Sequence, residues 1–216
     1  MRGAIVLCGG ESRRMGRPKA WLPFGPERLL QRVVRLVAEA VDRVVIVAAP
    51  GQELPETGDS VLVVRDPVAG RGPLQGLAAG LAALPASVEL AFATATDVPF
   101  LQPAWIECLH ALIGANDLAI PFAEGYHHPL AALYRRATIL PAIETLLAED
   151  RLRPFFLMER VRTRVVSDEE LRAVDPALAT LRNVNTPEAY QRALQDSGFP
   201  LQGATAPDTS PPGMAC

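Results

Sequence analysis

The sequence predicts a single-domain, three-layer α/β/α sandwich, in which helices cover both faces of a mostly parallel sheet. Short apolar runs alternate along the chain with segments of helical periodicity, which is typical of parallel strands joined by crossover helices. Several runs are apolar without alternation, as expected when both faces of a sheet are covered. A chain of 216 residues with 49% hydrophobic side chains is long enough for one sizeable core.

The apolar runs predict strands at residues 4–7, 43–47, 61–64, 90–94, 117–121 and 164–166. Between them, apolar positions at helical spacing predict helices at 27–41, 74–84, 103–113, 137–147 and 187–194. The first helix shows the pattern with Leu30, Val33 and Val37, and the last has Thr186 as its expected N-cap and Pro187 as its first residue. This order of elements predicts a Rossmann-like nucleotide-binding sheet, whose ligands lie outside the carboxyl ends of the strands.

Composition and charge limit the possible partners and the compartment. We expect an ordered domain at residues 1–198 and a disordered tail at 199–216, because the end of the chain is rich in Pro, Ser, Thr and Gly. A net charge of −3 shows no global basic excess, so nucleic acid is not an expected partner. No apolar stretch reaches the ~20 residues that span a bilayer. Cys8, Cys108 and Cys216 form neither a zinc signature nor a disulfide framework, which favours the cytoplasm.

A glycine-rich basic loop directly follows the first predicted strand. It contains Gly9, Gly10 and Ser12, and the cations Arg14 and Lys19. Glycine lets backbone N–H groups approach an anion closely, and the two cations can bind phosphate oxygens. The loop lacks both the P-loop lysine followed by serine or threonine and the G-x-G-x-x-G fingerprint. The plain alternative is a strand-to-helix turn with a solvated basic tip.

Other unusual residues follow two further predicted strands. Asp66 and the Gly72-Pro73 turn come after the third strand, and Asp97 comes directly after the fourth. A carboxylate at such a strand end can hold Mg²⁺, which prefers oxygen ligands and substrate phosphates. The alternatives are that Asp97 caps a local turn and that Gly72 begins a helix with nothing bound.

Two later segments hold further candidates. We expect His128 to lie near a second substrate and the neighbouring His127 to be exposed to solvent. Asn183 and Asn185 are either ligands in the same region or ordinary turn and capping residues. No Ser-His-Asp or Cys-His arrangement stands out by spacing, so covalent catalysis has no support in the sequence.

Five segments, in order, resemble the MobA-like nucleotidyltransferase family. Residues 7–25 are similar to its LAGGxSxRMGxxKxLLPxxG signature, with Cys8 where alanine is usual. Residues 72–77 resemble the GPLxGL segment of the molybdenum cofactor guanylyltransferase branch, and residues 96–101 resemble its metal-binding D-x-P-F/Y element. Residues 128–134 and 183–188 are similar to its HPLxALY and NxNTPE segments.

The resemblance implies transfer of GMP from GTP, with Mg²⁺, to a molybdenum-bearing molybdopterin phosphate, with release of pyrophosphate. Proteins that synthesise or deliver the cofactor are implied partners. By position, Arg14, Lys19 and Asp97 would be catalytic and Asp97 would hold the metal. The acceptor would meet His128, Asn183 and Asn185. The resemblance assigns the nucleotide to these residues: Leu7, Cys8, Gly9, Gly10, Ser12, Lys19, Asp66, Gly72, Pro73 and Asp97.

Other functions stay open at the level of the sequence. A cytidylyltransferase acting on molybdopterin or on a sugar or polyol phosphate would share the first motif. A non-catalytic nucleotide-binding protein that handles the cofactor would share the fold, although the intact set of Arg14, Lys19 and Asp97 speaks against it. A Rossmann dehydrogenase is disfavoured by the missing fingerprint.

Overall fold

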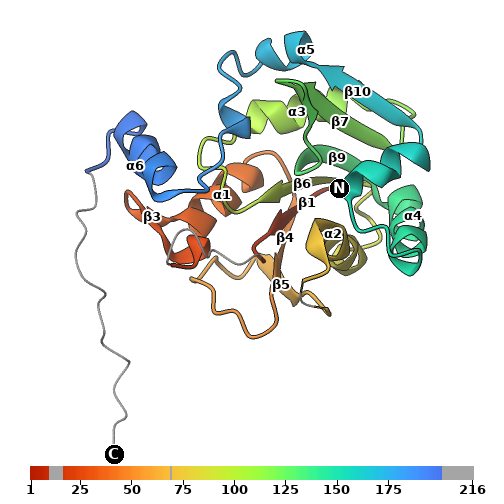
Figure 1. Cartoon of the computed structure of the whole chain (residues 1–216), viewed down its shortest axis with the longest axis horizontal. Coiled ribbons are helices and arrows are strands. Elements are labelled where there is room, and N and C mark those ends of the chain that lie inside the picture. The colour runs from red at the N-terminus through yellow and green to blue at the C-terminus, as the bar shows by residue number, and fades with distance from the viewer. Residues whose placement is uncertain (10–16, 69, 201–216) are drawn as a thin grey trace, which may run out of the picture.

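The computed structural model describes residues 1–9, 17–68 and 70–200. Its main sheet has the strand order β10-β7-β9-β6-β1-β4-β5, with β8 paired to β7 (Figure 1). The strands are β1 (Arg2–Leu7), β4 (Arg43–Ala48), β5 (Val61–Arg65), β6 (Leu90–Ala95), β7 (Leu118–Ala123), β8 (Tyr126–His127), β9 (Ala131–Arg135) and β10 (Thr163–Ser167). The pairs β1–β4, β1–β6, β4–β5 and β7–β10 are parallel, whereas β9 runs antiparallel to β6 and β7. The sheet is therefore mixed and mostly parallel, as predicted.

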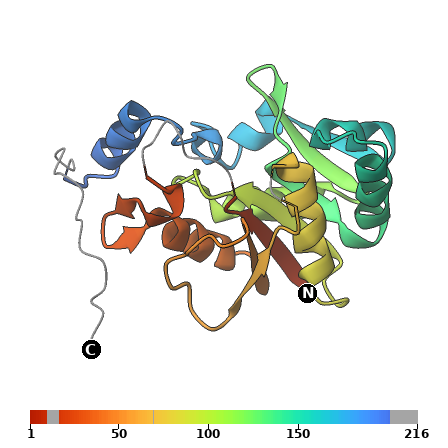
Figure 2. The same ribbon diagram turned by 60° about the horizontal axis from the view of Figure 1, so that its bottom comes forward.

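Helices cover both faces of this sheet (Figures 1 and 2). The helices are α1 (Leu29–Ala38), α2 (Gly72–Ala83), α3 (Pro103–Leu112), α4 (Arg136–Ala148), α5 (Asp168–Arg172) and α6 (Pro187–Asp196), with 3-10 turns η1 (Lys19–Trp21), η2 (Pro154–Glu159) and η3 (Ala179–Leu181). On one face α2 and α4 pack against the sheet, with Leu77 and Ile143 in the same buried core as Ile5. On the other face α1 and α3 pack with Val33 and Trp105 beside the sheet. The three-layer prediction is confirmed.

A third, smaller core lies beside the sandwich. The hairpin β2 (Pro23–Phe24) and β3 (Glu27–Arg28) packs against α6 through buried Phe24 and Tyr190. Phe199 also packs here, with its ring 5.6 Å from that of Phe24 in an edge-on arrangement. Most of the expected tail, residues 201–216, lies outside the described residues, and the boundary at 198 stays a prediction.

The predicted elements differ from the observed ones in two informative places. The first helix begins at Leu29 and not at Glu27, because Glu27 and Arg28 pair with Pro23 and Phe24 as a hairpin. Strand β9 was not predicted. It ends at Arg135 and α4 begins at Arg136, so the sequence has no turn signal between them. None of the helices in the described parts of the chain is long and apolar enough to cross a membrane.

Candidate functional site

The predicted site residues gather at the carboxyl edge of the parallel strands. Leu7 at the end of β1 pairs with Val47 of β4 and with Ala95 of β6. On the far side of β4, Ala48 pairs with Arg65 at the end of β5. The segments that follow β1, β5 and β6 therefore leave the sheet from one edge, as the sequence predicted.

Side chains connect these strand ends directly. The backbone N–H and the hydroxyl of Thr96 both donate to the carbonyl oxygen of Leu7, each at 3.1 Å. Gln52 donates from Nε2 to the carbonyl oxygen of Cys8 at 3.0 Å and accepts from the Ala49 N–H at 3.0 Å. Cys8 is buried, as expected for a small side chain at the strand end, and burial raises the pKa of its thiol. The thiol therefore stays protonated near neutral pH. The hydrogen bonds of Thr96 and Gln52 fix the backbone where the glycine-rich loop begins.

Lys19, Asp97 and Asn185 meet above the ends of β1 and β6. The Lys19 ammonium donates to Oδ2 of Asp97 at 2.8 Å and to Oδ1 of Asn185 at 2.5 Å. The side chains of Lys19 and Asp97 are mostly buried, with 22% and 15% of their surface exposed. The carbonyl of Asp97 also accepts the N–H of Val184 at 2.8 Å, which holds the 183–185 segment against this strand end. Lys19 thus shares one polar cluster with two residues that lie 78 and 166 positions further along the chain.

The donor set of this cluster fits a hard divalent cation. A carboxylate oxygen and an amide oxygen already converge on one positive charge, the Lys19 ammonium. Mg²⁺ is commonly held by one or two protein oxygens together with water and substrate phosphates. Within the described ranges no group of three or more His, Cys, Asp and Glu side chains could hold a metal by itself. The site therefore fits an ion whose other ligands come from a phosphate-bearing substrate.

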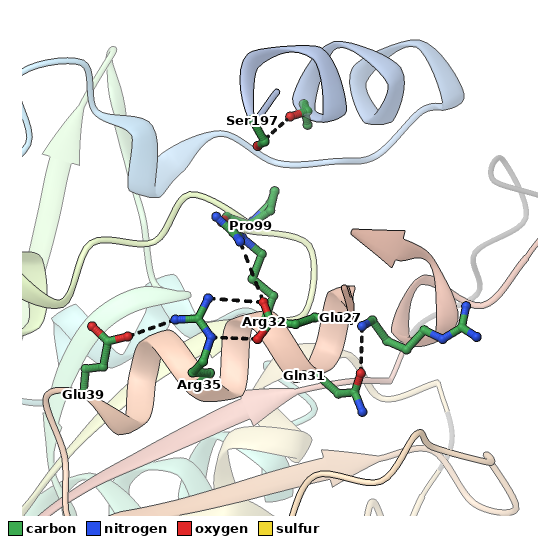
Figure 3. A network of polar contacts seen from close by, with 9 residues as sticks. Glu27, Gln31, Arg32, Arg35, Glu39, Pro99 and Ser197 are labelled. Carbon is green, nitrogen blue, oxygen red and sulfur yellow. Dashed lines mark hydrogen bonds and ion pairs between the residues drawn. The ribbon is translucent and has the colours of Figure 1, made fainter. Parts of the chain in front are cut away.

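A side chain of α1 holds the loop that follows Asp97. The Arg32 guanidinium donates to the carbonyl oxygen of Pro99 at 2.7 Å (Figure 3). It also lies 4.8 Å from the centre of the Phe24 ring. Burial lowers the pKa of Arg32, and nearby Glu27 opposes that shift. Hydrogen bonds from Arg35 lower the pKa of Glu27, so this carboxylate stays charged beside Arg32 (Figure 3). The network limits the movement of the backbone that carries Asp97.

The Gly72-Pro73 turn lies at the start of α2, at the same edge of the sheet. Gly72 has φ +77°, a conformation that favours glycine, whereas a Cβ there would meet its nearest neighbour, the Leu152 carbonyl, only at 3.8 Å. Backbone conformation and not crowding therefore explains the glycine. Arg71 donates to the Leu147 carbonyl and to Asp150, which fixes the turn against the end of α4. Asp66 accepts the Val68 N–H at 3.0 Å, which closes a local turn after β5.

The remaining predicted residues have mixed positions. His128 lies at the same edge, where β9 begins, but its Nε2 is 3.1 Å from the Ala123 carbonyl, so its ring also has a structural partner. The expectation of an exposed His127 was wrong, because its ring is half-buried between two phenylalanines. Asn183 is exposed next to Val184. Gly10, Ser12 and Arg14 lie outside the described residues.

Gln52 joins the ends of β1 and β4 and was not predicted as a site residue from the sequence. A single glutamine in a polar loop carries no pattern that marks it as a contact of the first strand. Its role becomes visible through the pairing of β1 with β4.

Comparisons with known proteins agree with the motif resemblance. The family model described as a MobA-like NTP transferase domain matches residues 4–165. The chain is 40% identical over 195 residues to a probable molybdenum cofactor guanylyltransferase of Mycobacterium avium (strain 104), covering 88% of this chain and 93% of that protein.

Solved structures show the same fold. The crystal structure of molybdopterin-guanine dinucleotide biosynthesis protein A from Archaeoglobus fulgidus has a TM-score of 0.74 at 23% identity, covering 92% of this chain and 99% of that one. A manganese complex of a protein from Mycobacterium tuberculosis H37Rv has a TM-score of 0.59 at 16% identity, covering 89% of this chain and 97% of that one.

Proposed function

Since the chain belongs to the MobA-like NTP transferase family, we propose that it transfers GMP from GTP to molybdenum-bearing molybdopterin and releases pyrophosphate. The chain spans 93% of a curated relative of that named activity, at 40% identity. The protein is a nucleotidyltransferase of molybdenum cofactor biosynthesis. The observation that carries the proposal is the meeting of Lys19, Asp97 and Asn185 at the end of β1 and β6.

The reaction joins two anions, and the site is suited to that task. A phosphate oxygen of the acceptor forms a bond to the α-phosphorus of GTP, and the bond from that phosphorus to the β-phosphate oxygen breaks. Pyrophosphate carries the bonding electrons away. Such transfers depend on positioning and on stabilisation of negative charge more than on an acid and base pair. Lys19, held between two oxygens at the strand ends, is placed to bind phosphate charge as it moves.

The divalent cation is proposed to be Mg²⁺, held by Asp97 and Asn185 with the triphosphate. When bound, it would neutralise phosphate charge and polarise a phosphoryl oxygen. The manganese complex of the fold relative from Mycobacterium tuberculosis supports a divalent ion in this fold. Asp97 supplies the full negative charge of the pair, so we expect its loss to be more severe than that of Asn185.

The other residue roles are proposals from position. Leu7, Cys8 and Gly9 end the first strand, and their backbone would line the nucleotide together with Gly10 and Ser12. Arg14 would bind phosphate beside Lys19. The turns at Asp66 and at Gly72-Pro73 would meet the ribose and base, and His128 and Asn183 would face the acceptor. Delivery proteins as partners and a cytoplasmic location stay predictions from the resemblance.

The test removes one charge from the site without changing its shape. We expect Asp97→Asn to fold normally and to lose guanylyl transfer by about 10²–10³-fold, because one preorganised charged group is removed. Asp42→Asn is the matched control, since Asp42 comes directly before β4, at the opposite end of the parallel strands, where it accepts the Arg2 N–H. Transfer is measured as pyrophosphate release with GTP and loaded molybdopterin, and near-normal turnover of Asp97→Asn would refute the proposal.

Base preference has its own measurement. We expect GTP with Mg²⁺ to raise Tm more than CTP, UTP or ATP do. A larger shift with CTP would support a cytidylyltransferase. GTP binding without pyrophosphate release, at saturating GTP and acceptor, would support a non-catalytic nucleotide-binding protein.

A further inference from the structure

Three aromatic rings form an exposed cluster that the nucleotide site does not use. Phe122 and His127 face each other across the β7–β8 pair, with ring centres 4.8 Å apart. Phe155 of η2 lies on the other side of His127, at 5.9 Å. Phe122 is 40% exposed and Phe155 is 49% exposed. We call Phe122, His127 and Phe155 the aromatic cluster.

The sheet places the aromatic cluster beside the proposed reaction centre. Thr94 of β6 pairs with Ala131 of β9, and the next strand, β7, reaches the same level at Pro121, whose carbonyl accepts the His128 N–H. Phe122 follows Pro121 directly, just as Ala95 follows Thr94. The aromatic cluster is thus two strand spacings, about 10 Å, to the side of the strand end that carries Asp97.

A second connection links the aromatic cluster to the Gly72 turn. Phe155 lies three residues after Leu152, whose carbonyl is the nearest neighbour of a Cβ built on Gly72, at 3.8 Å. Phe122 points to the α2 and α4 face, because Ile120, two residues earlier, is packed in that core. The aromatic cluster therefore borders the nucleotide site on the side of the β9 start, where His128 lies.

The chemistry of the rings indicates what covers them. Aromatic side chains favour offset or edge contacts with other rings. A flat heterocycle can stack on them without specific hydrogen bonds. The cluster presents two exposed rings, Phe122 and Phe155, with the half-buried His127 ring between them, beside a site that, under the proposed function, must receive a pterin as the second substrate. We propose that the aromatic cluster is the platform on which the pterin ring of the acceptor stacks while its phosphate reaches the site of Lys19 and Asp97. This inference rests on the proposed function.

Steady-state kinetics of guanylyl transfer, with molybdenum-bearing molybdopterin varied at saturating GTP and then the reverse, tests the platform. We expect Phe122→Ala and Phe155→Ala each to raise KM for the acceptor about tenfold, while KM for GTP and kcat at saturating acceptor change less than twofold. Tenfold corresponds to about 1.4 kcal/mol. Tyr126→Ala is the matched control, because Tyr126 is an exposed aromatic of the same hairpin on the opposite face of β8 from His127.

A second pair of variants separates stacking from plain apolar packing. Phe155→Tyr keeps a ring and is expected to keep the acceptor KM, whereas Phe155→Leu keeps apolar area and is expected to raise it. The variants change exposed residues, and an unchanged Tm confirms that they are folded. If both alanine variants keep the normal acceptor KM, the platform is refuted although guanylyl transfer stands. If the wild-type protein transfers no GMP to this acceptor, the proposed function itself fails.

Discussion

Lys19→Met is expected to have opposite effects on the binding of a divalent ion alone and on the binding of GTP. Without nucleotide, the Lys19 ammonium occupies the same oxygens of Asp97 and Asn185 that an ion would use. An ion that binds without nucleotide must displace the Lys19 ammonium from these oxygens. The ion is then repelled by the positive charge of the ammonium, which stays nearby. With GTP present, the triphosphate offers the ammonium new partners and offers the ion new ligands. The variant should therefore bind the bare ion more tightly and GTP more weakly.

The size of the effect follows from the contacts that the ion must break. Hydrogen bonds to charged groups contribute about 1.5–3 kcal/mol each when one partner is lost. The Lys19 and Asp97 side chains are 22% and 15% exposed, so solvent weakens the pair and the lower end applies. Every 1.4 kcal/mol is about tenfold in affinity. We therefore expect Lys19→Met to bind Mn²⁺ about tenfold more tightly than the wild-type protein, and GTP at least tenfold more weakly.

Electron paramagnetic resonance of free Mn²⁺ measures the first effect without any turnover, and calorimetry with GTP measures the second. Lys19→Arg is the matched control, because it keeps a cation near the two oxygens and should bind Mn²⁺ about as the wild type does. If Lys19→Met bound Mn²⁺ no more tightly than the wild-type protein, Asp97 and Asn185 would not be the ion's ligands and the competition argument would be wrong.

Two further predictions concern stability. Hydrogen bonds from Arg162 lower the pKa of Asp117 from 3.8 to about 2, so the pair stabilises the fold above pH 4 and this stabilisation is lost as the pH falls toward 2. Because Arg162 is 67% exposed, solvent weakens the pair, and we expect a small urea-unfolding difference between wild type and Asp117→Asn that shrinks in acid. A Cβ on Gly80 would lie 2.5 Å from Ile5, whereas one on Gly76 has its closest contact at 3.2 Å. Gly80→Ala should therefore cost about 1–3 kcal/mol of the free energy of unfolding and Gly76→Ala less, and equal costs would contradict this packing argument.

The sequence could predict the layers because their signals are local. Most parallel strands contain a short apolar run, and most covering helices have apolar residues at helical spacing, so the order and type of these elements follow from hydrophobic periodicity. Strand β9 shows the limit of that reasoning. Its apolar residues, from Ala131 to Tyr134, form an equally good run, but the strand leads into α4 without an intervening turn. The partners of β9, Phe92 and Ala119 among others, are distant in sequence and cannot be inferred from period.

The site divides in the same way. Asp97 and Lys19 could be picked out as charged residues near predicted strand ends, and the rule that ligands bind at those ends predicted that they would be close. Asn185, the second partner of Lys19, had an equally good local explanation as a turn residue. The contact that brings Asn185 to Lys19 joins residues 166 positions apart, which no local signal encodes.

The segment at 183–185 shows how this distant contact is nevertheless specified. Val184 is 2% exposed and packs with Phe24 in the small core beside α6, while its N–H donates to the carbonyl of Asp97. In an extended chain, neighbouring side chains point in opposite directions, so burying Val184 turns both asparagines outward. Asn185 then lies at the strand end because a valine beside it is buried, and its amide reaches Lys19 as a consequence. The asparagine-valine-asparagine alternation therefore indicates a buried valine as well as two polar residues that face outward. A substitution that removes Val184 from the core should disturb Asn185 although it touches no substrate.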